Sequence, residues 1–224
     1  VPGSFVPAPG NTYALRILTA EGKGYESDAV EMVPVPEIGK LWFEKDEGIV
    51  ESVDRELDGI SIYLDTEDPT GQCLYYRWEY DELWEFTVPY PVFFDYIDED
   101  TIVYTPPVNQ YCWKRDRSTG ILVQSTDQLA EDRIERYQLG FHAPELSDRF
   151  NILYSVNVKQ FSMNAAEYSF WDKLKINNQD VGDIFEKQPV IVNSNIFNVD
   201  DEDEKVVGFF RVSDVKERRL YLDR

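Results

Sequence analysis

The stretch from Cys73 to Tyr90 constrains the fold most, because apolar and polar side chains alternate along nearly all of it. The apolar positions are Leu74, Tyr76, Trp78, Tyr80, Trp84, Phe86 and Val88. Glu82 interrupts this series, and the intervening positions are mostly charged. A period of two with aromatic side chains predicts a β-strand with one buried face. Because such a strand exceeds the usual five or six residues, we expect a bend or bulge near Asp81 and Glu82.

Further segments with the same period predict more strands. Residues 149–161 alternate, and their apolar side chains share one face: Ile152, Tyr154, Val156 and Val158. Residues 111–114 and 120–125 predict a strand pair that turns around residues 116–119. The chain is therefore expected to be mainly β, built from immunoglobulin-like sandwich units.

A proline-rich connector divides the chain. Residues 12–17 and 25–32 alternate on either side of a glycine turn, which predicts a hairpin. The segment Pro34–Pro36 that follows cannot continue a ladder of hydrogen bonds. We expect residues 1–36 to be the carboxyl-terminal hairpin of a partly present N-terminal β-sandwich. Residues 37–224 would form the main β-sandwich domain.

One helix is expected on the second unit. Asn164 and Glu167 have the spacing of a capping box, and apolar residues recur at helical intervals after them. The pattern predicts an amphipathic helix over residues 165–177, with Trp171 and Leu174 packed on a sheet.

The charge balance excludes some partners. The 224 residues include 22 Lys and Arg against 43 Asp and Glu, a net charge of −21. Such a field repels nucleic acid and anionic lipid headgroups, so neither is an expected partner. No apolar run approaches the roughly 18 residues of a membrane-spanning helix.

The sequence contains no motif of a known catalytic or metal-binding site. His142 is the only histidine, and no G-x-S-x-G accompanies it, so no nucleophile–histidine arrangement is expected. Two cysteines and one histidine cannot supply a standard zinc site. The acidic segments 65–68 and 200–204 do not fit the calcium-loop pattern and are interpreted as solvated turns. We predict no catalytic residue, metal or cofactor, although a carboxylate-based hydrolase stays an alternative because acids are abundant.

An aromatic cluster is the predicted binding surface. Tyr90, Phe93, Phe94 and Tyr96 lie in an irregular stretch bounded by proline, where burial is less certain than in the strands. Exposed together, they would form a patch for a partner or ligand. Such a patch would also suit a glycan- or peptide-binding module.

Cys73 and Cys112 leave two alternatives open. In an exported protein they would form one disulfide, which the chain-entropy model values at about 4 kcal/mol. Otherwise they are separate thiols, or one pairs with a cysteine outside residues 1–224.

Four segments resemble a known family. They are YYRWEYDELWEF (75–86), YCWKRDRSTGILVQST (111–126), YSVNVKQFSMNAAEYSFWDKLKINNQDVGDIFEKQPVIVNSNIFNV (154–199) and VVGFFRVSDVKERRLYL (206–222). These segments are similar to Bacteroidota outer-membrane lipoproteins that carry the domain of unknown function DUF4249. GNTYALRI (10–17) also resembles the end of that family's amino-terminal sandwich.

The resemblance implies a lipid-anchored protein of the outer membrane, at the cell surface or on the periplasmic face. It also implies association with a TonB-dependent transporter or another β-barrel complex. The chain opens on Val-Pro-Gly and leads straight into a strand pattern, so we expect it to be a piece of a longer protein. The lipid anchor would then lie outside residues 1–224. The family has no established catalytic residues, so the resemblance assigns none to this chain.

Overall fold

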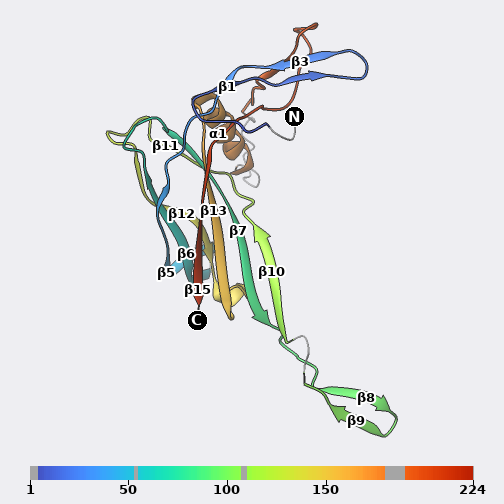
Figure 1. Cartoon of the computed structure of the whole chain (residues 1–224). Helices are drawn as coiled ribbons and strands as arrows, with labels where there is room; N and C mark the ends of the chain where they lie inside the picture. The colour runs from blue at the N-terminus through green and yellow to red at the C-terminus, as the bar shows by residue number, and fades with distance from the viewer. Residues whose placement is uncertain (1–4, 53–54, 107–109, 180–189, 224) are drawn as a thin grey trace.

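The computed structural model describes residues 5–52, 55–106, 110–179 and 190–223 (Figure 1). The chain is mainly β, as predicted, with a helix at one end of a long strand-built body. The strands of the body are β5 (Ile38–Ser52), β6 (Arg55–Glu67), β7 (Tyr75–Thr87), β10 (Tyr111–Arg117), β11 (Leu122–Ser125), β12 (Arg133–His142), β13 (Leu153–Ser162) and β15 (Val215–Asp223). A short 3-10 helix, Pro144–Leu146, follows β12.

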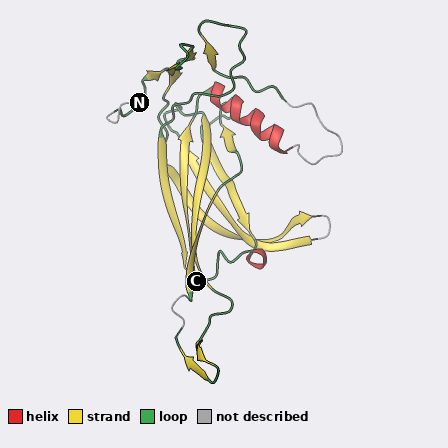
Figure 2. Ribbon diagram, turned by 90° about the vertical axis from the view of Figure 1, so that its right-hand side faces the viewer, coloured by secondary structure: helices red, strands yellow, loops and turns green. Residues whose placement is uncertain are grey.

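Two antiparallel sheets form a sandwich. In the described part of the chain, one sheet has the order β10-β7-β13-β15 with β11 also paired to β7, and the other has the order β12-β6-β5. The long strands run side by side through the body in Figure 2. The core draws fully buried side chains from both sheets, among them Ile62, Leu64, Trp78, Tyr154 and Val156. Burial of this apolar layer is the main source of stability.

The strand β7 organises its sheet without the expected bulge. Its pairing with β13 runs unbroken from Glu85 opposite Leu153 to Tyr76 opposite Ser162, so the predicted irregularity near Asp81 and Glu82 is wrong. The interruption lies instead in the neighbouring strand. There β10 pairs with the carboxyl-terminal half of β7 and β11 with its beginning. The predicted pairing of residues 111–114 with 120–125 is therefore also wrong.

Ser118 completes the hydrogen bonding of β7 across the gap between β10 and β11. It lies between β10 and β11, and its backbone N–H donates to the carbonyl oxygen of Tyr80 at 2.9 Å. Its hydroxyl accepts from the Tyr80 N–H at 3.0 Å. Both polar backbone groups of Tyr80 are thus satisfied where the ladder breaks.

The predicted buried face of β7 is confirmed. Tyr76, Trp78 and Trp84 are almost fully buried. The indole N–H of Trp78 donates to Gln160 Oε1 at 2.9 Å, and Gln160 Nε2 donates to Thr66 Oγ1 at 3.0 Å. This chain of hydrogen bonds joins β7 and β13 to β6 in the facing sheet. Satisfied polar groups of this kind are compatible with a buried layer.

Glu82 shares this face and is itself buried, at 2% exposure. Its Oε1 lies 2.7 Å from His142 Nε2 and its Oε2 lies 3.1 Å from Arg149 Nη2, while the Tyr154 hydroxyl donates to Oε1. Burial acts to raise the pKa of Glu82, but the hydrogen bonds and charges of these partners outweigh it. They lower the pKa to about 2. Glu82 therefore stays ionised inside the sandwich.

The predicted helix is confirmed as α1 (Ala165–Gln179). Asn164 caps it, since its Oδ1 accepts from the Glu167 N–H at 2.8 Å. Trp171 packs against the outer face of β7, where its ring lies 4.9 Å from the guanidinium carbon of Arg77. Within the described residues, no helix is both long and apolar enough to span a membrane.

The small amino-terminal sheets lie beside α1 at one end of the body (Figure 1). Their strands are β1 (Thr12–Tyr13), β2 (Arg16–Leu18), β3 (Gly24–Ser27), β4 (Val30–Glu31) and β14 (Ile196–Asn198). The predicted hairpin is present, because β2 pairs with β3 and β1 with β4. However, β14 pairs with the other edge of β3. Residues 196–198, which lie in the segment 37–224, thus pair with a strand of the segment 1–36.

Both cysteines are free thiols. Cys112 lies opposite Phe86 near the end of β7, whereas Cys73 precedes its beginning. Tyr75, where β7 begins, and Phe86 are 11 residues apart, which at about 3.3 Å per residue is a span of roughly 36 Å. A disulfide needs Cα atoms within about 7 Å, so the bridge that the sequence permitted is not formed.

Candidate functional site

A two-stranded hairpin projects from the end of the body opposite α1 (Figures 1 and 2). It consists of β8 (Phe94–Asp98) and β9 (Thr101–Tyr104) and is inserted between β7 and β10. The two strands pair only with each other in the described part of the chain. An isolated two-stranded hairpin is marginally stable in water, because its side chains bury little surface.

The hairpin has one apolar face. Its register places Phe94 opposite Tyr104 and Tyr96 opposite Ile102, and paired residues of an antiparallel ladder lie on the same face. Each of these four side chains is between 58% and 68% exposed. The rings of Phe94 and Tyr104 make an edge contact with centroids 5.8 Å apart. We call Phe94, Tyr96, Ile102 and Tyr104 the hairpin's aromatic face.

The tip is polar, whereas the opposite face is mixed, because Val103, which is 46% exposed, pairs there with Asp95. Asp95 lies on the opposite face and accepts from the Thr105 hydroxyl at 2.9 Å. The turn between the strands carries Glu99 and Asp100, next to Asp98 at the end of β8. Hydrogen bonds from the Thr101 hydroxyl and the Asp100 N–H lower the pKa of Asp98. The tip is therefore a run of three exposed acids beside an apolar face.

The structure exposes each of the four residues predicted as a binding patch. Phe94 and Tyr96 are on the aromatic face, Phe93 precedes β8, and Tyr90 is 90% exposed in the segment leading to the hairpin. Sequence reasoning missed the returning strand, which adds Ile102 and Tyr104. The apolar run Thr101–Tyr104 after the acidic turn was the available signal.

Two further aromatic side chains are exposed on the sandwich. Tyr111 and Trp113 of β10 are 60% and 53% exposed. The strand β10 is an edge strand, paired on one side with β7. Contiguous exposed apolar patches are uncommon on monomers and are often found at interaction sites.

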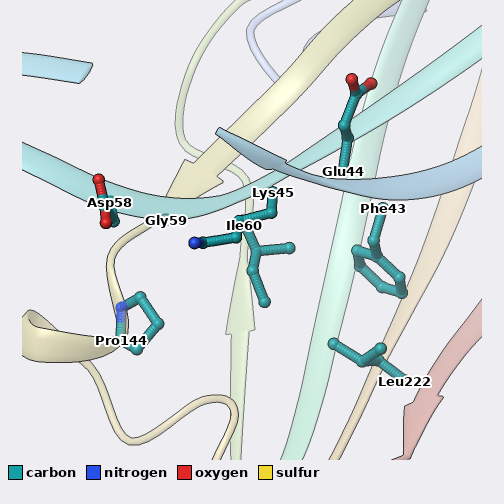
Figure 3. Close-up of a pocket in the computed structure, with 8 residues that line it drawn as sticks. All are labelled: Phe43, Glu44, Lys45, Asp58, Gly59, Ile60, Pro144 and Leu222. Carbon is teal, nitrogen blue, oxygen red and sulfur yellow. The ribbon is translucent and has the colours of Figure 1, made fainter. Parts of the chain in front are cut away.

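A separate apolar pocket of about 360 Å³ lies in the sandwich near the end of β15 (Figure 3). Phe43, Ile60 and Leu222 point into the same space, whereas the carboxylate of Glu44 points away and is bound by Arg136. Asp58 accepts from the Gly48 N–H at 3.1 Å. Both lining carboxylates are thus engaged elsewhere, and the pocket is suited to apolar groups.

A third feature bears on the hydrolase alternative. Asp68 and Asp132 line a pocket of about 430 Å³ at the loop after β6. Burial raises the pKa of Asp132. For Asp68, burial acts in the same direction, but hydrogen bonds from Thr70 and from the N–H groups of Cys73 and Gln72 outweigh it and lower the pKa. Those bonds fix Asp68 as the organiser of a turn.

Comparisons with known proteins point to one family. The family model described as "Domain of unknown function (DUF4249)" matches residues 1–219. No curated protein and no solved structure matches the chain.

Proposed function

The chain belongs to the DUF4249 family, and from this membership we propose that it is a non-catalytic accessory lipoprotein of the outer membrane. Its partner in this proposal is a TonB-dependent transporter or another outer-membrane β-barrel complex. A lipid anchor outside residues 1–224 attaches it to the membrane. The hairpin β8–β9 is the element that binds the partner.

The uncovered aromatic face carries this proposal. Alternation in β8 and β9 produces an apolar face of the kind that sheets normally bury, yet Phe94, Tyr96, Ile102 and Tyr104 are all exposed. Aromatic residues are enriched in the cores of protein interfaces and among the residues that contribute most of the binding energy. Burial of this face against a partner would also stabilise a hairpin that packs on no other strand.

The non-catalytic part of the proposal rests on the roles of two acids. Glu82 is ion-paired in the core and Asp68 organises a turn.

Gentle purification of the full-length protein from its native membrane tests the proposal. Mass spectrometry should identify an outer-membrane β-barrel protein in the purified complex. Replacing Tyr96 and Ile102 together by Ser should reduce its recovery roughly tenfold, because two apolar anchors are lost. Val207→Ser is the matched control, since Val207 is 98% exposed and lies outside the hairpin. Recovery of the wild type as a lone monomer would contradict the proposal.

A glycan- or peptide-binding module is the second candidate. Phe93 and Tyr104 favour it, because their rings are nearly parallel, at 9°, with centroids 6.4 Å apart. A glycan array would show specific binding that Tyr90→Ala and Phe93→Ala remove. An array without binding eliminates the glycan version of this candidate.

A further inference from the structure

The tip of the hairpin is acidic, and this charge indicates what kind of surface the partner offers. Asp98, Glu99 and Asp100 are exposed and lie where the hairpin reaches farthest from the sandwich (Figures 1 and 2). The Asp100 N–H donates to Asp98 Oδ1 at 3.1 Å, which holds the turn in shape. A partner that approaches along the axis of the hairpin therefore meets three carboxylates before it meets the aromatic face.

From this arrangement we propose that the hairpin docks into an apolar cleft of a protein, with Lys or Arg side chains where the acidic tip comes to lie. This inference rests on the proposed function and adds the chemistry of the partner. The aromatic face, whose four side chains are all apolar or aromatic, fills the cleft, and the mixed face of Asp95 and Val103 points away from it. The acids select the partner and orient the hairpin, because charge complementarity acts mainly on association rate and register.

A membrane surface fits the hairpin less well. Aromatic side chains alone would suit the interface of a bilayer. Here, however, three acids lie at the tip, beyond the aromatic residues, and the whole chain carries a net charge of −21. Anionic lipids attract basic segments and repel acidic ones. A second copy of the chain is disfavoured for the same reason, since two acidic tips and two acidic bodies repel each other.

The chain offers an unusually close control for a test. Asp201, Glu202 and Asp203 repeat the tip sequence Asp-Glu-Asp on an exposed turn outside the hairpin. The turn geometry is repeated as well, because the Asp203 N–H donates to Asp201 Oδ1 at 3.1 Å. Changing either triplet to Asn-Gln-Asn raises the net charge by the same amount, so only the position differs.

The experiment measures association of the full-length protein with outer-membrane vesicles from cells that lack it. Protein-free vesicles made from the extracted lipids of that membrane serve as the second probe. The tip variant Asp98→Asn, Glu99→Gln, Asp100→Asn should associate about tenfold more slowly at low salt and lose most of its salt dependence. The control variant Asp201→Asn, Glu202→Gln, Asp203→Asn should stay within about twofold of the wild type.

The outcomes separate this inference from the proposed function. Equal slowing of both variants, or no slowing of either, overturns the inference while the protein partner stands. Equal binding to the protein-free vesicles overturns it in favour of lipid. If the wild type binds neither kind of vesicle, the proposed function fails and the inference fails with it.

Discussion

Glu82→Gln tests whether the buried ion cluster stabilises the sandwich. The substitution preserves the size of the side chain and removes its charge. It leaves Arg149 and His142 in the core beside a neutral amide. Removing one partner of a buried ion pair typically costs about 3–5 kcal/mol. Arg149 keeps its second partner, since its Nη2 lies 2.7 Å from Asp116 Oδ2, so we expect the lower end of this range.

The pKa of Glu82 provides a second estimate of the magnitude. A folded-state pKa of about 2 against an ordinary 4.5 corresponds to a stabilisation of about 3 kcal/mol at pH 7. Because the pKa is depressed on folding, this stabilisation is complete above about pH 5 and is lost as the pH falls toward 2. At pH 3 roughly half of it should remain.

Urea unfolding followed by tryptophan fluorescence measures the effect. Glu82→Gln should lower the free energy of unfolding by about 3 kcal/mol at pH 7 and by about half that amount at pH 3. Glu85→Gln is the control, because Glu85 lies on the same strand but on its outer face, and the change should cost less than about 0.5 kcal/mol. The reasoning is refuted if the two variants are equally stable, or if the deficit of Glu82→Gln does not change with pH.

Three further predictions concern the two thiols, the close packing at Gly59 and the helix-capping residue Asn164. Cys112 should react with maleimide in the folded protein at least about 100-fold faster than Cys73, because burial raises the pKa of Cys73 to about 12; similar rates for both would contradict its burial. Gly59→Ala should destabilise the sandwich by about 1–3 kcal/mol in urea unfolding, because a Cβ there would lie 2.4 Å from the Phe141 ring. Gly120→Ala, with nothing within 4 Å, should be neutral, and equal effects would count against this packing. Asn164→Ala should cost about 1 kcal/mol by the same measurement, and no loss would show that the cap is dispensable.

The strands with strong alternation were the most predictable part of the fold. The side chains of β7 and β13 have a period of two with large apolar groups, and this pattern identifies the buried face without knowledge of neighbours. The same argument cannot choose a partner for a short strand. Segments 111–114 and 120–125 have the spacing of a hairpin, but β7 is long enough to pair with both in succession.

Glu82 shows a second limit of sequence reasoning. Its place in the alternation indicates an acid on a buried face, but its partners come from β12, β13 and the segment between them. Only the topology brings His142, Arg149 and Tyr154 to it. The contact between the lone histidine and Glu82 in the core therefore could not be predicted from a local sequence motif.

The aromatic cluster of the hairpin was predictable by residue type and not by exposure. The aromatic cluster at 90–96 was visible in the sequence, whereas alternation cannot show whether an apolar face is covered. The structure leaves it uncovered because β8 and β9 are held away from the sandwich (Figure 2). The returning residues Ile102 and Tyr104 became part of the surface only through the register of the hairpin.

Hydrogen–deuterium exchange tests most directly whether the hairpin is the docking element. The full-length protein is compared free in solution and bound to outer-membrane vesicles from cells that lack it. The account predicts that amides of residues 94–104 exchange rapidly in the free protein and at least about tenfold more slowly in the bound state, while those of β13 are unchanged. Unchanged exchange of residues 94–104 in the bound protein would contradict it.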